Sequence, residues 1–434
     1  MNFGFMSDIL RNLTRLALVR VGAIGLIFLT QTWIIKIFGL QEYGKFVYFI
    51  SLTSLVAVLS KGGLDVLLLK RVAAAVANSE SFENIQKIRR IYLGRGILIS
   101  AAVSTAVIFG MAQYSLGQGL DGGTAWILFY IASISTVAFQ VLLGFERGRG
   151  NLVTADLFDQ VVRTCMMLAC VGVLMSFAVD SASKLQAAYA ISFSGTAYVV
   201  YRTYRPGNHS SLLSGIRKNS VTDANSYTLR QHATFTASGL LTFVFFQMDG
   251  LILSHHVSSA ELGAYNMACN LARFVIFIPM IILVIFQSKV AVAFVNDNRS
   301  NLAIYFFQSI ILSLLGASLT AIIFFVCGRY VLEMIDPAVG IAFPALKVLL
   351  LAYFINSVLM VIGAFAVLSK NYIKLVVAQA IGAIATAISY IMLASNYGQV
   401  GVAWSVVVGL SVVVLAAGFL FRFAIIDGID LLRA

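Results

Sequence analysis

Apolar segments of about twenty residues recur along the whole chain, and short polar stretches separate them. About twenty apolar residues is the length that an α-helix needs to cross a bilayer. The period-two alternation that marks the strands of a membrane barrel is absent. We therefore predict an all-α polytopic membrane protein with about 12 transmembrane helices. The predicted spans cover residues 16–38, 44–69, 93–112, 125–145, 157–179, 185–201, 231–254, 263–287, 303–327, 342–368, 374–394 and 400–423.

One stretch of the chain occurs twice. Residues 38–73 and 257–292 each hold a short turn, an apolar run and a basic exit. A constant offset of 219 residues aligns Glu42 with Glu261, Gly44 with Gly263 and Lys70 with Lys289. Because this offset is about half of the 434 residues, the sequence predicts a duplicated unit, as in transporters that are built from two related halves.

The duplication predicts two pseudo-symmetric bundles of six helices. Residues 1–205 form the N-terminal bundle, residues 206–230 a polar cytoplasmic linker, and residues 231–434 the C-terminal bundle. Lys and Arg concentrate in alternate loops, which the positive-inside rule places in the cytoplasm. The opposite loops hold only a few cations, namely Lys36, Lys45, Lys184 and Arg329. Both termini are therefore predicted to be cytoplasmic.

The composition excludes a soluble globular protein. Hydrophobic residues make up 60% of the chain and charged residues 11%, with a mean hydropathy of +0.92, whereas a soluble domain is about 25% charged. The net charge of +12 does not indicate a nucleic-acid partner, because the cations follow the loop pattern. No two cysteines have the CxxC spacing, so we expect neither a disulfide nor a metal site.

The features of a membrane-bound enzyme are missing from the sequence. The outer connections are too short to hold the catalytic carboxylates that a polymerase or a glycosyltransferase usually carries outside the bilayer. No HExxH, GxSxG or Walker A motif occurs either. We therefore expect no enzymatic activity and no cofactor.

Residues 79–92 form a short amphipathic segment between the second and third predicted spans. Acidic residues lie in its first turn and basic residues in its last, which favours a helix. Its apolar stripe consists of Phe82, Ile85, Ile88 and Tyr92. We expect this helix to lie on the inner membrane surface.

Several cations fall within the predicted spans, namely Arg20, Lys61, Arg163, Arg273 and Lys347. Each costs several kcal/mol at the bilayer centre unless it faces a polar cavity or a partner. Asp159 precedes Arg163 by four residues, which predicts a structural pair on one helix. Lys347 lies near the outer end of its span, where a lysine can extend to the membrane surface.

Helical spacing shows where the other cations point. Ser54, Lys61 and Asp65 share one face of the second span, and Asn266, Asn270 and Arg273 share one face of the eighth. The offset of 219 aligns Ser54 with Arg273, so both repeats are predicted to turn the same face inward.

These faces lead to the hypothesis of a central cationic cavity. The first, second, seventh and eighth spans would enclose it, and Arg20, Lys61 and Arg273 would bind substrate. Gln31 shares a face of the first span with Arg20. The alternatives are that Arg20 extends to the membrane surface and that Lys61 only pairs with Asp65 four residues later.

Asp249 is the one acid well inside the second half of the chain. Such a carboxylate suits H⁺ or Na⁺ coupling, and pairing with Arg273 explains it equally well. Pro279 interrupts the eighth span, so a kink is expected there.

Three segments resemble a known family. They read GLQEYGKFVYFISL…GGLDVLLLKRVA in the first half, QMDGLILSHHVSSAELGAYNMA around the seventh span, and YGQVGVAWS near the end. The chain resembles the polysaccharide-unit flippases, which are Wzx-type O-antigen and exopolysaccharide transporters of the multidrug/oligosaccharidyl-lipid/polysaccharide (MOP) superfamily. The resemblance covers nearly the whole chain, and its motifs are loose turn-plus-glycine patterns.

The resemblance implies a function as well as a fold. It implies alternating access and the movement of a polyprenyl-pyrophosphate-linked oligosaccharide from the cytoplasmic to the periplasmic leaflet of the bacterial inner membrane. Other polysaccharide-assembly membrane proteins would then be partners. An ion-coupled multidrug antiporter of the same fold is the main alternative, and a membrane polysaccharide polymerase or ligase is a weaker one.

Overall fold

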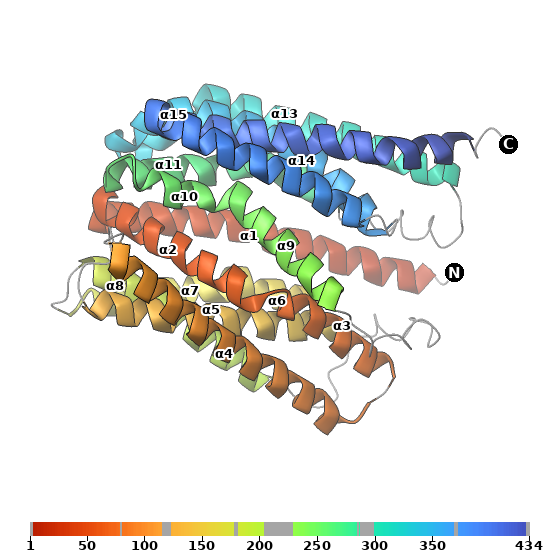
Figure 1. The fold of residues 1–434 in the computed structure, drawn as a ribbon, viewed down its shortest axis with the longest axis horizontal. Coiled ribbons are helices and arrows are strands. Elements are labelled where there is room, and N and C mark those ends of the chain that lie inside the picture. Colours follow the sequence, from red (N-terminus) through yellow and green to blue (C-terminus); the bar gives the residue numbers. More distant parts are fainter. Residues whose placement is uncertain are drawn as a thin grey trace. The chain divides into compact units, whose positions relative to one another are not determined.

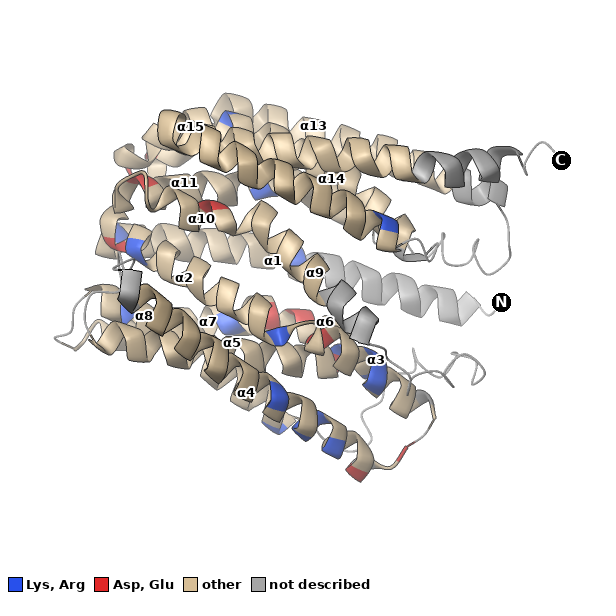
Figure 2. Ribbon diagram, viewed as in Figure 1, with Lys and Arg blue, Asp and Glu red and all other residues tan. Residues whose placement is uncertain are grey.

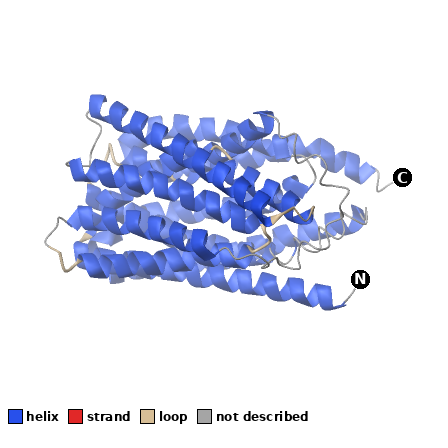
Figure 3. Ribbon diagram, turned by 90° about the horizontal axis from the view of Figure 1, so that it is seen from below, coloured by secondary structure: helices blue, strands red, loops and turns tan. Residues whose placement is uncertain are grey.

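The structure is a computed structural model that describes residues 3–78, 80–114, 123–177, 181–203, 229–283, 286, 299–368 and 372–430. The described residues form helices joined by short turns and contain no strand (Figure 3). Eight of the helices are long and apolar enough to cross a membrane, and two shorter apolar helices cover Gly22–Phe38 and Thr236–Phe246. The predicted fold class, an all-α multi-pass membrane protein, is confirmed.

The helices follow the predicted spans (Figure 1). In the first half they are α1 (Phe3–Phe38), α2 (Leu40–Lys61), α3 (Leu64–Ala77), α4 (Phe82–Tyr114), α5 (Gly123–Gly148), α6 (Leu152–Asp156), the π-helical η1 (Leu157–Val162), α7 (Arg163–Leu174) and α8 (Ser181–Thr203). In the second half they are α9 (Leu229–Phe246), α10 (Met248–Leu253), α11 (Ser259–Ala272), the 3₁₀ turns η5 (Arg273–Ile276) and η6 (Pro337–Ala342), α13 (Arg299–Ile335), α14 (Phe343–Leu368) and α15 (Tyr372–Asp430).

Some predicted spans are broken. The span expected at 44–69 is interrupted between α2 and α3, where Gly62 and Gly63 have φ angles of 45° and 77°. Only glycine adopts such angles readily, so a continuous helix was the wrong prediction there. Gly398, with φ 51°, likewise kinks α15 between the last two predicted spans.

Contacts group the chain into two compact units. Unit 1 contains residues 1–21, 31–44 and 244–434, and unit 2 contains residues 22–30 and 45–243. The end of α1 and the first turn of α2 therefore belong with the C-terminal helices. The bundles predicted at 1–205 and 231–434 follow the duplication and stay a prediction, and the linker predicted at 206–230 lies almost entirely outside the described residues.

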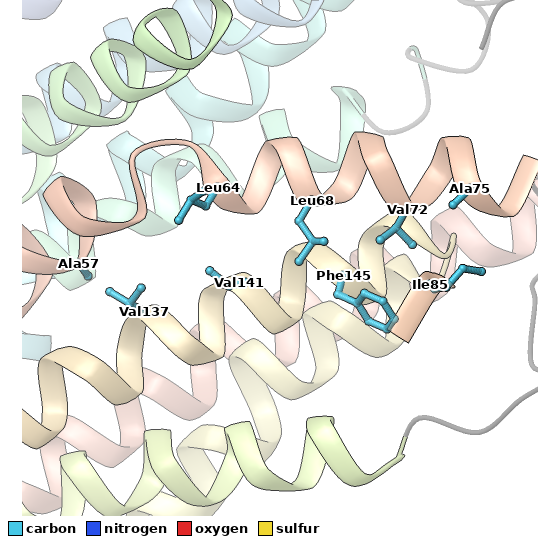
Figure 4. Packing of buried hydrophobic residues seen from close by; sticks show 9 residues of the cluster. All are labelled: Ala57, Leu64, Leu68, Val72, Ala75, Ile85, Val137, Val141 and Phe145. Carbon is cyan, nitrogen blue, oxygen red and sulfur yellow. The ribbon is translucent and has the colours of Figure 1, made fainter. Parts of the chain in front are cut away.

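The core of unit 2 forms where α3 packs against α5. Figure 4 shows the buried cluster, whose members recur every three or four residues along both helices, as the core-facing stripes of packed helices do. It consists of Ala57, Leu64, Leu68, Val72, Ala75, Ile85, Val137, Val141 and Phe145.

The predicted surface helix at 79–92 is instead the first part of α4. Ile85 belongs to the buried cluster, and Ile88 and Tyr92 pack against it. Arg89 is buried, donates to the Tyr201 carbonyl at 3.2 Å and lies over the Tyr201 ring. Ile85, Ile88 and Tyr92 therefore face protein, because α3 and α5 offer them a matching surface.

In unit 1, α14 packs against α11, α13 and α15. The start of α11 is fixed by a capping box, in which the Glu261 backbone N–H donates to the Ser258 hydroxyl and the Ser258 backbone N–H donates to the Glu261 carboxylate. Such a box satisfies two otherwise unpaired donors at a helix start. Glu261 is also the residue that the repeat aligns with Glu42.

The two repeats touch through equivalent glycines in unit 1. A Cβ on Gly44 would overlap the carbonyl oxygen of Ser259, and a Cβ on Gly263 would lie 2.8 Å from the carbonyl oxygen of Leu40. The offset of 219 residues relates Gly44 to Gly263 and Leu40 to Ser259. The first turns of α2 and α11 therefore pack on each other reciprocally, with backbone against backbone.

We expect Gly44→Ala and Gly263→Ala to lower the stability of the protein. The added methyl groups meet main-chain atoms that cannot rotate away, and such overpacking costs about 1–3 kcal/mol or more. Thermal unfolding in detergent micelles measures the loss. Gly25→Ala is the control, because a Cβ there meets nothing within 4 Å. Equal unfolding temperatures for all three variants would contradict the proposed close contact.

Candidate functional site

A chain of hydrogen bonds joins polar side chains of unit 1. Asn270, which is 5% exposed, is at its centre. Its Nδ2 donates to Oδ1 of Asn266 at 2.9 Å and to Oε1 of Gln31. The Tyr43 hydroxyl donates to the same Asn266 oxygen at 2.8 Å. The network therefore connects α1 and the first turn of α2 with α11.

Arg273 extends this network to α14. Its Nη1 donates to Oδ1 of Asn270 at 3.0 Å, and its Nε donates to the Tyr353 hydroxyl at 3.2 Å. Both hydrogen-bond partners are neutral, so neither compensates the positive charge of Arg273. Its two hydrogen bonds use only part of the five donors of a guanidinium.

The backbone at Arg273 is irregular, and Pro279 explains why. A proline cannot donate to the carbonyl four residues before it, and its ring clashes with that carbonyl, which here belongs to Val275. The chain accordingly forms the 3₁₀ turn η5 over Arg273–Ile276 before helical structure resumes. The kink predicted at Pro279 thus falls a few residues earlier and sets the position of Arg273.

Asp249 lies in the first turn of α10, directly after a break at Gln247. Its Oδ1 accepts the Gly250 backbone N–H at 2.8 Å, and its Oδ2 accepts the Cys269 thiol at 3.7 Å. Among the described residues, no cation forms an ion pair with it. The expected pairing with Arg273 is therefore absent as an ion pair, although Arg273 acts on Asp249 electrostatically.

In unit 2, Lys61 and Asp65 form the ion pair that their spacing allows, with Nζ and Oδ2 3.2 Å apart. The pair bridges the glycine break between α2 and α3. Both side chains are partly buried, at 22% and 19% exposure. Ser54 lies two turns earlier on α2 and is half-buried.

A second group of charges in unit 2 surrounds η1. Arg147 on α5 reaches Asp156 at 3.2 Å and Asp159 at 3.5 Å. Arg163 donates from Nε to the main-chain oxygen of Asp159 at 2.8 Å and lies over the Phe193 ring. Arg163 is therefore held by Asp159 through the main-chain oxygen and also acts on the Asp159 carboxylate electrostatically, while the ion pair of that carboxylate is with Arg147.

The remaining predicted positions are less informative. Arg20 lies half-buried on α1 in unit 1. Lys347 is exposed, with its ammonium 5.1 Å from the centre of the Phe343 ring. In unit 2, other cations gather toward one end of α3 and α4 (Figure 2). Among the described residues, no three His, Cys, Asp or Glu side chains come together as a metal site.

The structure thus brings together Gln31, Asn266, Asn270 and Arg273 by hydrogen bonds, and their part in a substrate cavity stays a prediction. Lys61 and Asp65 pair in unit 2, and their part in a shared cavity stays a prediction. Sequence reasoning missed the aromatic hydroxyls, of which Tyr353 is the most important. The signal available for Tyr353 was a hydroxyl within the otherwise apolar run of residues 348–355.

Four of the charged groups share one structural feature, since each lies at an irregular point of a helix. Lys61 precedes the glycine break, Asp159 lies in a π turn, Asp249 follows the break at Gln247, and Arg273 begins a 3₁₀ turn. Non-helical backbone at membrane depth is tolerated only where protein or a water-filled cavity surrounds it. The π turn η1 also indicates a functional site, because such turns occur frequently at functional sites.

Solved transporter structures share this fold. The chain is similar to an inward-facing MATE family multidrug resistance transporter of the MOP superfamily, with a TM-score of 0.70, 15% identity and coverage of 96% of this chain and 99% of that one. It is also similar to the lipid II flippase MurJ in an inward closed conformation, with a TM-score of 0.71, 12% identity and coverage of 94% and 87%. A variant of the Vibrio cholerae MATE transporter VcmN gives a TM-score of 0.67, 13% identity and coverage of 97% and 98%.

No protein-family model matches the sequence, and no curated protein matches it either. At these low identities the structural likeness establishes the fold.

We expect Tyr353→Phe to destabilise the protein by about 1.5–3 kcal/mol, the typical contribution of a hydrogen bond to a charged group. The change removes the acceptor of the Arg273 Nε–H and keeps the ring. Thermal unfolding in micelles checks the effect against Tyr397→Phe, whose side chain is 65% exposed. If the two variants unfold alike, the hydroxyl does not hold Arg273.

A double-mutant cycle measures the Lys61–Asp65 pair. We expect Lys61→Met or Asp65→Asn alone to cost about 1–3 kcal/mol, between the values for exposed and buried pairs. The double variant should recover part of the loss, since neither charge is then left alone. The exposed pair of Arg329 and Glu333, with the same spacing, is the control and should show no measurable coupling. Additive losses at Lys61 and Asp65 would argue against the pair.

Proposed function

We propose that the protein is a flippase that moves a polyprenyl-pyrophosphate-linked oligosaccharide from the cytoplasmic to the periplasmic leaflet of a bacterial inner membrane. It would serve the synthesis of O-antigen, exopolysaccharide or capsule. Likeness to the fold of a lipid II flippase supports this proposal, together with the sequence resemblance to polysaccharide-unit flippases. Transport would proceed by alternating access and without enzymatic chemistry.

The main support for the proposal is the charge of Arg273 and the neutral character of its hydrogen-bond partners. It is a cation within an apolar helix, and its hydrogen-bond partners, Asn270 and Tyr353, are neutral. A half-buried cation in an apolar segment that forms no ion pair with an acid is costly, so its presence suits a ligand that brings the negative charge. A pyrophosphate group fits, because a guanidinium binds phosphate oxygens with two parallel hydrogen bonds.

The other predicted residues have supporting parts in this proposal. Arg20 and Lys61 would add positive charge along the path of the pyrophosphate. Lys61 would leave its ion pair with Asp65 and pair with the pyrophosphate of the substrate instead. Asp249 would couple transport to H⁺ or Na⁺, because its carboxylate has no cationic partner among the described side chains. Its buried neighbours Tyr265 and Cys269 act on it together with the Gly250 N–H and the charge of Arg273.

The second candidate is an ion-coupled multidrug antiporter. The similar fold of MATE family multidrug transporters favours it. A cationic drug would need an acid as its partner, and Asp249 is the candidate in unit 1. Against this stands the positive charge of Arg273 in the same unit.

Deletion of the gene in its own host tests the function directly. We expect loss of surface polysaccharide and accumulation of polyprenyl-linked units on the cytoplasmic side. Complementation with Arg273→Gln should restore less than about a tenth of the wild-type polysaccharide, because it removes the charge that binds phosphate. Arg273→Lys should restore more, since it keeps the charge.

The same strain separates the two candidates. A deletion strain without a redundant flippase could make normal polysaccharide and become more sensitive to cationic drugs. This result would contradict the flippase function and support the antiporter function. Western blotting of the membrane fraction controls for the amount of each variant.

A further inference from the structure

We propose that Asn270 determines the charge selectivity of this site, because its neutral amide holds Arg273 without neutralising it. This inference rests on the proposed anion-binding role of Arg273. It assigns Asn270 a role of its own, as a positioning residue that acts on substrate through Arg273.

The hydrogen bonds of Asn270 fix which atom faces the arginine. Both N–H groups of its Nδ2 are used, one toward Gln31 and one toward Asn266. Its Oδ1 is therefore the atom left for Arg273, and it accepts Nη1 at 3.0 Å. The amide cannot flip without losing all of these bonds, so an oxygen acceptor always faces the guanidinium.

The partners of Asn270 are themselves held in place. The Asn266 oxygen also accepts the Tyr43 hydroxyl, so the acceptor that orients the Asn270 amide is fixed from the first turn of α2. Tyr43 and Asn270 are both buried, at 1% and 5% exposure. The arrangement is preorganised, which means that binding an anion at Arg273 requires no rearrangement of its supports.

A carboxylate at position 270 would have the same shape as the amide and the opposite effect. It would pair with Arg273 and supply internally the negative charge that a bound anion would otherwise bring. It would also lose both N–H donors and place its second oxygen against the oxygens of Gln31 and Asn266.

Among the described residues, none of the other charged and titratable groups around Arg273 takes the place of Asn270 as the partner that sets the charge selectivity. Tyr353 is a neutral hydroxyl that accepts the Nε–H. Asp249 and Cys269 act on Arg273 from α10 and α11, but the Asp249 oxygens accept the Gly250 N–H and the Cys269 thiol. Asn270 is thus the position where a single atom change converts the partner of the arginine from neutral to anionic.

The experiment measures binding of inorganic pyrophosphate and of tetraphenylphosphonium to the purified full-length protein in detergent, by isothermal titration calorimetry. Asn270→Asp should weaken pyrophosphate binding at least tenfold and lower the ratio of pyrophosphate to tetraphenylphosphonium affinity by at least the same factor. Asn270→Gln, which keeps a neutral amide, should stay within about fivefold of the wild type. Asn396→Asp on α15 adds the same charge at an exposed position and should change neither affinity.

Arg273→Gln separates failure of this inference from failure of the proposed function. If Arg273→Gln abolishes pyrophosphate binding while Asn270→Asp binds as the wild type does, the role of Asn270 is wrong and the anion site stands. If Arg273→Gln binds pyrophosphate as well as the wild type, the anion site itself is wrong.

Size-exclusion chromatography shows whether Asn270→Asp folds. If it does not, Asn266→Asp places the new charge one hydrogen bond further from Arg273. That variant should weaken pyrophosphate binding at least threefold, and unchanged binding would overturn the inference.

Discussion

The backbone contact between the first turns of α2 and α11 is the constraint on which the candidate site depends. Gly44 and Gly263 occupy equivalent positions in the two repeats, and each lacks the Cβ that would separate the helices. This close approach lets the Tyr43 hydroxyl reach Asn266 and thereby orient Asn270. A duplicated glycine is thus the local cause of an asymmetric polar network, because only the second repeat carries the asparagines and Arg273.

The second constraint is the cost of charge and of unpaired backbone groups in an apolar surrounding. Regular helix satisfies its own backbone groups internally. Where the helices break, side chains and backbone satisfy one another, as when Arg163 donates to the Asp159 carbonyl and Asp249 accepts the Gly250 N–H. Lys61, Asp159, Asp249 and Arg273 therefore lie at irregular turns in the two units, and Arg273 joins the polar network at one of these interruptions.

Local contacts were predictable where sequence spacing decides them. Lys61 and Asp65 are four residues apart, and Asn266, Asn270 and Arg273 recur with helical period, so their shared faces follow from helix geometry. The contact between Arg147 and Asp159 follows no such period, since it joins two helices. The same holds for Arg273 and Tyr353, which are 80 residues apart. The breaks at Gly62–Gly63 and at η5 had visible causes in a glycine pair and in Pro279, whereas the π turn η1 had none.

Hydrophobic periodicity by itself determined that the chain is a multi-pass helical membrane protein and where most of its helices lie, while the duplication of its halves follows from the aligned residues and stays a prediction. It could do so because bilayer thickness fixes the length of an apolar span and because side-chain direction repeats along a helix. Only the tertiary structure decided which polar groups meet. Hydrogen bonds between helices act over about 3 Å, and a sequence pattern does not give the separation of two helices to that accuracy. The choice of neutral hydrogen-bond partners for Arg273 is therefore a property of the packing of α1, α11 and α14.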